Sequence, residues 1–155
     1  MPLDRIDRHI LSLLQAEGRI TNVDLAERVG LTAPPCLRRV RALEEAGVIR
    51  GYRAELDGPR LGYAITVFAM VSLRSQAERD LAAFEQHVGA IDEVRECHML
   101  NGEIDFILKI VARDLQSFQT LLTTQLTAAP NVASVKTSLT IRTAKALSGV
   151  PVDPA

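Results

Sequence analysis

Residues 22–47, NVDLAERVGLTAPPCLRRVRALEEAG, constrain the fold of this chain more than any other stretch. Two short helical patterns are separated by Gly30, which can adopt the positive φ that a tight turn requires. Thr32 suits the N-cap of the second helix, and Pro34 or Pro35 suits its first turn, where the missing N–H would be unpaired anyway. The stretch therefore predicts a helix-turn-helix, an arrangement whose usual ligand is DNA.

The second helix of this motif divides into an apolar side and a basic side. Leu37, Val40 and Leu43 recur at helical spacing and predict the buried stripe, with Cys36 on the same side. Within residues 32–53, five arginines stand against two glutamates. The planar fork of arginine suits both phosphate and the guanine edge in the major groove. A merely solvated helix face is the alternative. We predict double-stranded DNA as a partner, contacted by Thr32, Pro34, Arg38, Arg39, Arg41, Arg50 and Arg53.

The charge balance argues against binding of nucleic acid through bulk charge alone. The chain has 155 residues and a formal net charge of −1, and residues 1–60 contain ten arginines against nine acidic residues. Affinity for DNA must then come from a local patch, present in more than one copy. No apolar run approaches the length of a membrane span, and no signal peptide precedes the first helical pattern. We expect a cytoplasmic protein with no membrane partner.

No catalytic or metal-binding pattern is found in the sequence. Cys36 and Cys97 lie in separate segments and form neither a disulfide framework nor a zinc-ligand spacing. Cys97 and His98 cannot act together as nucleophile and base, because neighbours on a strand point to opposite faces. We therefore predict no enzyme, no metal and no cofactor. A small enzyme on the same scaffold is the alternative that fold alone does not exclude.

Hydrophobic periodicity predicts an α+β protein of two domains. Residues 4–17 form an amphipathic helix behind the helix-turn-helix, and residues 48–56 are expected to form a short strand, the wing. The second half has the order βαββαβ, typical of the ferredoxin-like fold. Its expected elements are strand 64–73, helix 78–88, strands 94–100 and 106–112 around an Asn101-Gly102 hairpin, helix 115–126 and strand 132–143. We predict a winged helix-turn-helix domain at 1–60, a ferredoxin-like ligand-binding and oligomerisation domain at 61–147, and a flexible tail at 148–155.

The first strand of the second half is apolar on both of its faces. Ile65, Val67 and Ala69 lie on one face, and Phe68 and Met70 lie on the other. In a ferredoxin-like fold both helices cover the same face of the sheet, which leaves the second face open. A strand that is apolar on both faces is expected to be buried on both. A second copy related by a two-fold axis would cover the open face and supply a second DNA-reading unit.

Four segments together resemble the Lrp/AsnC family, the leucine-responsive or feast/famine transcriptional regulators. They are LDRIDRHIL near the start, GRITNVDLAERVGL, PCLRRVRALEEAGVIRGY and ECHMLNGEIDFILK. The resemblance covers residues 3–146 and is greatest to the leucine-responsive branch. It implies a transcriptional regulator of amino-acid metabolism, whose dimers assemble into octamers or other multiples and whose DNA affinity or assembly responds to an amino acid. A ligand-independent, nucleoid-like protein that wraps DNA is the alternative function.

The resemblance also implies where an effector binds, at a contact between dimers near the loop after the second strand of the effector domain. Exposed backbone N–H groups at Asn101 and Gly102 would receive the carboxylate of an amino acid, and Asp105 its ammonium group. A simple hairpin turn with a capping aspartate is the alternative. The apolar loop residues favour leucine or a similar apolar amino acid. The assigned residues are Met99, Leu100, Asn101, Gly102, Glu103, Ile104 and Asp105, with Val135 and Thr137 from the last strand.

Overall fold

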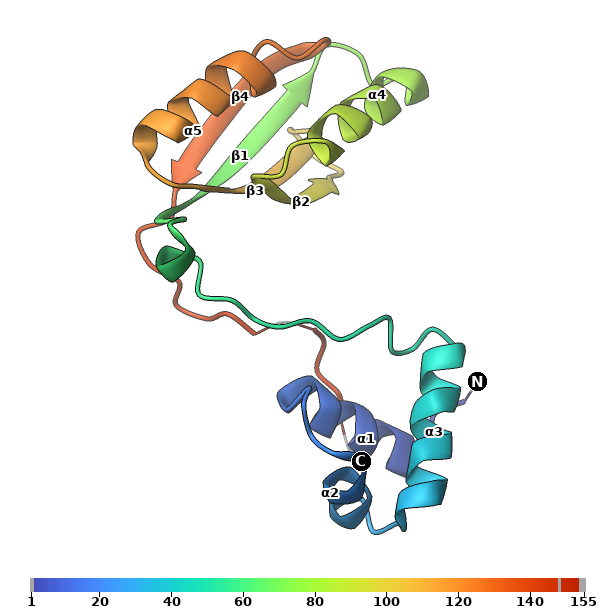
Figure 1. Cartoon of the computed structure of the whole chain (residues 1–155). Helices are drawn as coiled ribbons and strands as arrows, with labels where there is room; N and C mark the ends of the chain where they lie inside the picture. The colour runs from blue at the N-terminus through green and yellow to red at the C-terminus, as the bar shows by residue number, and fades with distance from the viewer. Residues whose placement is uncertain (1, 148, 154–155) are drawn as a thin grey trace. The chain divides into compact units, whose positions relative to one another are not determined.

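The computed structural model describes residues 2–147 and 149–153, which divide into two compact units (Figure 1). The N-terminal unit comprises the chain up to Glu55 together with the C-terminal residues from Lys145 onward. The C-terminal unit is Leu56–Ala144. Of the residues predicted to form a flexible tail, the described residues 149–153 cluster with the N-terminal unit.

Three helices form the N-terminal unit: α1 (Arg5–Ala16), α2 (Asn22–Arg28) and α3 (Ala33–Glu45). Asp4 caps α1 in a reciprocal capping box with Asp7, which satisfies two backbone N–H groups at the start of the helix. Between α2 and α3 the chain turns at Gly30, whose φ of 73° confirms the predicted left-handed conformation. The core contains six buried side chains: Ile10, Leu25, Ala26, Cys36, Val40 and Leu43.

Two predictions for this unit are wrong. Leu37 is 38% exposed, because the buried stripe of α3 runs through Cys36, Val40 and Leu43 and Leu37 lies about 100° around the helix from Cys36. Residues 48–56 form no strand. A strand needs a neighbour to pair its backbone groups, and among the described residues of this unit there is no other strand.

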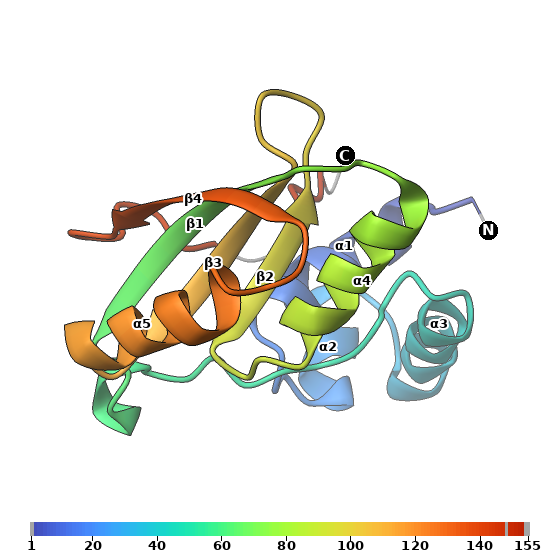
Figure 2. The same cartoon turned by 90° about the horizontal axis from the view of Figure 1, so that it is seen from above.

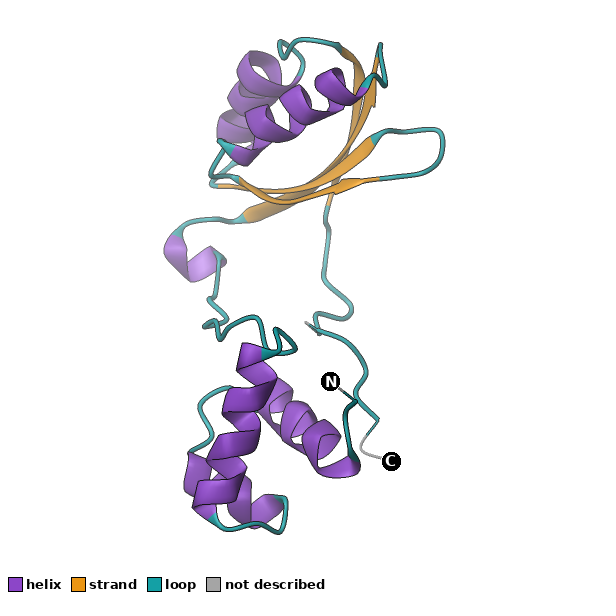
Figure 3. Ribbon diagram, turned by 90° about the vertical axis from the view of Figure 1, so that its right-hand side faces the viewer, coloured by secondary structure: helices purple, strands orange, loops and turns teal. Residues whose placement is uncertain are grey.

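The C-terminal unit has the predicted βαββαβ order. Its elements are η1 (Pro59–Leu61), β1 (Ile65–Leu73), α4 (Glu78–Gly89), β2 (Val94–Met99), β3 (Phe106–Ala112), α5 (Leu115–Leu121), the π-helical turn η2 (Leu122–Leu126) and β4 (Val132–Leu139). The sheet has the strand order β2-β3-β1-β4, and its neighbouring strands are all antiparallel. Both helices lie on one face of this sheet, and within the unit the other face is uncovered (Figures 2 and 3).

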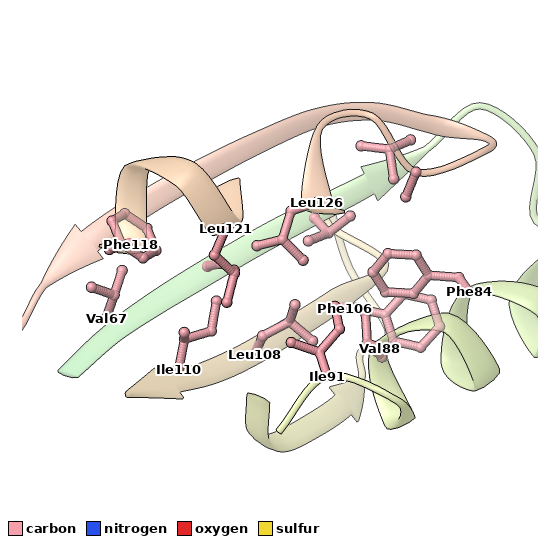
Figure 4. Close-up of a cluster of buried hydrophobic side chains, with 14 of the residues drawn as sticks. Val67, Phe84, Val88, Ile91, Phe106, Leu108, Ile110, Phe118, Leu121 and Leu126 are labelled. Carbon is pink, nitrogen blue, oxygen red and sulfur yellow. The ribbon is translucent and has the colours of Figure 1, made fainter. Parts of the chain in front are cut away.

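A cluster of sixteen buried side chains fills the space between the helices and the sheet (Figure 4). Alternate residues of β1 and β3, including Val67, Ala69, Leu108 and Ile110, face the helices. Phe84 of α4 and Phe106 of β3 pack with their ring centroids 4.8 Å apart. This side of the sheet is therefore the apolar core, and Phe68 and Met70 point to its other side.

Element ends differ from the predictions in two places. The expected helix 115–126 changes to π-helical geometry after Leu121, and β4 ends at Leu139 rather than at residue 143. The β2–β3 hairpin is confirmed, but six residues connect the strands. Asn101 does not have the positive φ that a two-residue Asn-Gly turn requires. The connection is therefore a broad loop that extends beyond the strands (Figure 2).

Candidate DNA-binding surface and ligand loop

Helix α3 presents three of the predicted residues on the side opposite its buried stripe. Pro34, Arg38 and Arg41 are exposed and follow one another at intervals of four and three residues, so they share one face. Thr32 occupies the N-cap, where its carbonyl accepts from the backbone N–H of Cys36 at 3.3 Å. Thr32 is exposed, and its hydroxyl makes no capping hydrogen bond. This face carries two guanidinium groups that can reach DNA.

Arg39 has a different role from its neighbour Arg38. Its Nη1 donates to Asp4 Oδ2 at 2.8 Å and to Asp7 Oδ1 at 2.7 Å, which ties α3 to the start of α1. These hydrogen bonds raise the pKa of Arg39, and that to Asp7 contributes most. The pKa of Asp4 is lowered, first by the backbone N–H of Asp7 and then by Arg39. Arg39 therefore ties α3 to α1 through Nη1, while its side chain remains 34% exposed.

The segment after α3 carries the other two predicted arginines. Arg50 and Arg53 are exposed and lie in irregular chain rather than in a wing strand. Between them, the Tyr52 hydroxyl donates to Glu44 Oε1 of α3 at 2.9 Å. Burial and this hydrogen bond raise the pKa of Tyr52 to about 12. The contact holds the segment close to the C-terminal end of α3.

The predicted ligand loop is accessible over most of its length. Met99 is 61% and Leu100 is 40% exposed, and residues 101–103 are exposed as well. Ile104 is half-buried. The two ends of the loop are joined by a hydrogen bond from Leu100 N to Asp105 O at 2.8 Å. The loop thus offers apolar side chains and free backbone at the end of the β2–β3 hairpin.

Asp105 is anchored to the neighbouring strand. Its Oδ2 accepts from Leu73 N at 2.6 Å and from Gln76 Nε2 at 3.4 Å, while its backbone N donates to Val71 O at 2.9 Å. The carboxylate therefore also caps the end of β1. Because both side-chain hydrogen bonds fall on Oδ2, Oδ1 is the atom that can receive an ammonium group.

Val135 and Thr137 lie on β4, across β1 from the ligand loop in the strand order. Val135 pairs with Val71 and is half-buried against the apolar core, so it does not reach the loop of its own chain. Thr137 pairs with Ala69 and is exposed at the sheet edge. The structure does not bring these two residues together with Met99–Asp105 within one chain, and they can complete a site only in a neighbouring copy.

The open face of the sheet is apolar at its centre and charged toward β2. Phe68 is 38% exposed, and Met70, Ile107 and Val111 are half-buried on this side. Glu96 of β2 accepts from Lys109 Nζ at 3.0 Å and contacts His98 Nε2 at 3.2 Å. The hydrogen bond from Lys109 is the main cause of the lowered pKa of Glu96. An apolar strip flanked by charges is typical of a protein interface.

Cys97 and His98 point to opposite faces of β2, as predicted. The register pairs Cys97 with buried Leu108 and pairs His98 with Ile107 on the open face. Burial raises the pKa of Cys97 to about 11, so its thiol is not activated. In the part of the chain that the structure describes, no helix is long and apolar enough to cross a membrane.

Both units match known families along almost their whole length. Residues 66–150 match the model of the Lrp/AsnC ligand binding domain, and residues 3–50 match a winged helix-turn-helix DNA-binding model. The chain belongs to the Lrp/AsnC family of transcriptional regulators. The predicted family and α+β fold class are thereby confirmed.

Several Lrp/AsnC relatives cover nearly the whole chain. The leucine-responsive regulatory protein of Rhizobium meliloti (strain 1021) is 56% identical over 143 residues, which are 92% of each chain. The Bkd operon transcriptional regulator of Pseudomonas aeruginosa is 42% identical over 150 residues, 97% of this chain and 98% of the relative. A Neisseria meningitidis transcriptional regulator solved in complex with L-Met is similar in structure, with a TM-score of 0.94, 34% identity and 98% coverage of both chains. These relatives are regulatory proteins.

Two residues of this Lrp/AsnC chain are candidates that sequence reasoning missed. Leu37 is exposed on α3 beside Arg38, and an apolar side chain there can contact a thymine methyl group. The spacing of Cys36, Val40 and Leu43 was the signal that could have placed it outside the core. Gln76 approaches Asp105 from the β1–α4 loop, and no local sequence pattern indicates this contact.

Proposed function

We propose that this regulator binds specific DNA with α3 and that an apolar α-amino acid modulates its DNA affinity or its assembly. The observation that carries the proposal is the contrast within α3: Arg38 and Arg41 are exposed on the outward face, while Arg39 is held by two carboxylates. Arg38 and Arg41 read base edges, and Arg50 and Arg53 contact phosphates. Thr32 and Pro34 lie at the end of α3 that enters the groove in helix-turn-helix proteins.

Arginine variants test this division of roles. Replacing Arg38 with alanine is expected to weaken specific binding by about 1–3 kcal/mol, as a bidentate base contact would. Arg50→Ala and Arg53→Ala are expected to weaken binding to specific and random duplexes by the same factor. Both variants are also expected to lower the salt dependence of DNA affinity. Arg39→Ala is expected to lower the melting temperature of the N-terminal unit. Anisotropy titrations over a range of salt measure these effects, and unchanged specific affinity in Arg38→Ala contradicts the assignment.

For the effector, the chemistry of the loop favours an uncharged, apolar side chain. Asn101 and Gly102 offer backbone N–H groups to the carboxylate, and Asp105 Oδ1 offers one negative charge to the ammonium group. Met99, Leu100 and Ile104 surround these groups with apolar surface. The L-Met bound to the Neisseria relative supports an apolar amino acid, and we expect leucine to bind best. Thr137 and Val135 of a neighbouring copy complete the site, with Glu103 at its rim.

A panel of amino acids in a thermal-shift experiment tests the effector. A ligand that binds only the folded state must raise the melting temperature. Asp105→Asn keeps an oxygen for Leu73 N but removes the charge, so we expect it to lose the ligand-induced shift and to retain DNA binding. Glu103→Gln, in the same loop, is the matched control and should retain most of the shift. A basic amino acid as the best ligand contradicts the apolar site. If no amino acid shifts the melting temperature, a ligand-independent DNA-wrapping function is supported instead.

We further propose that two copies pack their open sheet faces together and that these dimers assemble into octamers or other multiples. Phe68→Asp would bury a charge beside Lys109, which already pairs with Glu96, at a cost on the order of 3–5 kcal/mol. Sedimentation is then expected to show monomers or aggregates. Leu115→Asp is the control, because Leu115 is 62% exposed at the start of α5 on the helical side. A Phe68→Asp protein with wild-type mass contradicts this interface.

A further inference from the structure

The C-terminal residues 149–153, which we call the strap, dock on α1 of the N-terminal unit through one side chain. Gln15 Nε2 donates to Val150 O at 2.7 Å, and Val150 N donates to Gln15 Oε1 at 3.2 Å. The side-chain amide of Gln15 thus satisfies both backbone groups of Val150, as a neighbouring strand would. This reciprocal contact joins residues 135 positions apart in the sequence.

Gly149 precedes the contact, at a position where a side chain would strain the backbone and displace the flexible Gln15 amide. Gly149 has a φ of +85°, a conformation that side chains disfavour. A Cβ atom at this position would also overlap the Gln15 amide, with its Cδ only 2.6 Å away. Backbone conformation and packing therefore independently favour glycine here. The strap therefore contacts α1 at a defined position, through Gln15.

The strap lines one groove together with the basic segment, which we define as residues 48–53. The groove has a volume of about 690 Å³, and its apolar lining includes Leu11, Leu14, Ile49 and Val152. Val152 is half-buried there. Arg50 and Arg53 line the same groove while remaining exposed. The strap therefore covers apolar surface directly beside both arginines.

The basic segment has little other support. Val48 N and Ile49 N donate to Leu43 O at 3.0 and 3.1 Å, and Tyr52 donates to Glu44. The segment belongs to no helix or strand. Irregular chain with few contacts is expected to open locally at little cost in free energy. Removing the strap would expose the groove and leave Arg50 and Arg53 in a mobile segment.

We propose that the strap docks on α1 through Gln15, forms one wall of this groove, and orders the basic segment for contact with DNA phosphates. The inference rests on the phosphate role proposed above for Arg50 and Arg53. Ordering these side chains before binding lowers the entropy cost of the DNA complex. The contribution is independent of base sequence, because phosphates are the same in every duplex.

Two substitutions and a truncation test the strap in the full regulator. Gly149→Ala strains the backbone and displaces the Gln15 amide from Val150. Gln15→Ala removes the paired hydrogen bonds, and a stop codon after Leu147 removes the strap. Each is expected to weaken binding to specific and random duplexes by the same factor, about three- to tenfold, and to reduce the salt slope by about 1. Hydrogen exchange of residues 48–53 is expected to become faster. Gly89→Ala is the control, since a Cβ there meets nothing within 4 Å.

Other results of these experiments would show which part of the proposal is wrong. Faster exchange with unchanged DNA affinity means that the strap docks without serving DNA binding, and this overturns the proposal. Tighter DNA binding in the variants means that the strap competes with DNA, which also overturns it. If Arg50→Ala and Arg53→Ala leave affinity unchanged while strap variants speed exchange, the phosphate assignment fails and the docking surface remains.

Discussion

The two units of this regulator differ in the number of apolar side chains that they bury. The C-terminal unit buries sixteen apolar side chains between two helices and a sheet, whereas the N-terminal unit buries six. The N-terminal unit adds polar contacts between its segments: Arg39 with Asp4 and Asp7, Asn22 with Ala33 O at 2.8 Å, Tyr52 with Glu44, and Gln15 with Val150. Small units bury a smaller fraction of their surface and so depend more on such contacts. We expect the ligand-binding unit to be sensitive to cavities and the DNA-binding unit to changes of charge.

The largest expected effect is a cavity in the C-terminal unit. Phe106 is fully buried and packs against Phe84, so Phe106→Ala should lower the free energy of unfolding by about 3–5 kcal/mol. Calorimetry should show the transition of the C-terminal unit moved to lower temperature and that of the N-terminal unit unchanged. Leu115→Ala, at an exposed site, is the control. Equal shifts of both transitions would show that the units unfold together.

A smaller effect is expected from a charge in the N-terminal unit. Asp7 is 7% exposed and accepts hydrogen bonds from Arg39 and from Asp4 N. Asp7→Asn should lower the free energy of unfolding by about 2 kcal/mol, because it replaces a charged hydrogen-bond acceptor beside Arg39. Asp4→Asn, at the exposed partner of the same arginine, should destabilise less. If Asp7→Asn lowers the melting temperature of the C-terminal unit alone, the expected charge sensitivity of the DNA-binding unit is wrong.

The smallest effect concerns Tyr52 and is measured by ultraviolet titration of the phenol. With Tyr63 replaced by Phe, the remaining tyrosine should ionise at a pKa of about 12, above the ordinary value of 10. The raised pKa contributes stability that is complete below pH 10 and is lost as the pH rises to 12. Glu44→Gln should lower the pKa while burial keeps it above 10. A measured pKa of 10 for Tyr52 would show that the segment after α3 does not pack against the helix.

Local patterns were sufficient to predict most elements. The turn at Gly30, the helix α4 and the order βαββαβ follow from glycine, periodicity and alternation, which act over a few residues. The open sheet face was also predicted, because Phe68 and Met70 alternate with Val67 and Ala69. The wrong predictions arise where a local sequence pattern is compatible with two different structures. Residues 48–56 were expected to form a short wing strand, but no partner strand exists among the described residues of that unit.

The candidate sites likewise include features that the sequence predicted and contacts that only the structure shows. Sequence alone placed arginines on α3 and the predicted ligand loop after β2. It did not distinguish Arg38 from Arg39, because both are arginines on the same helix and only one faces the acids of α1. It likewise did not show that Asp105 caps β1 through Leu73 N, since that contact spans 32 positions.

The sequence by itself determined the helix-turn-helix, the ferredoxin-like unit and the basic character of α3, since each depends on residue types at short, regular spacing. The tertiary structure decided which arginine is free, which oxygen of Asp105 remains available, and that the last residues return to α1. These depend on contacts between segments up to 135 positions apart. Such contacts form only when packing brings distant segments together, and no local period in the sequence encodes them.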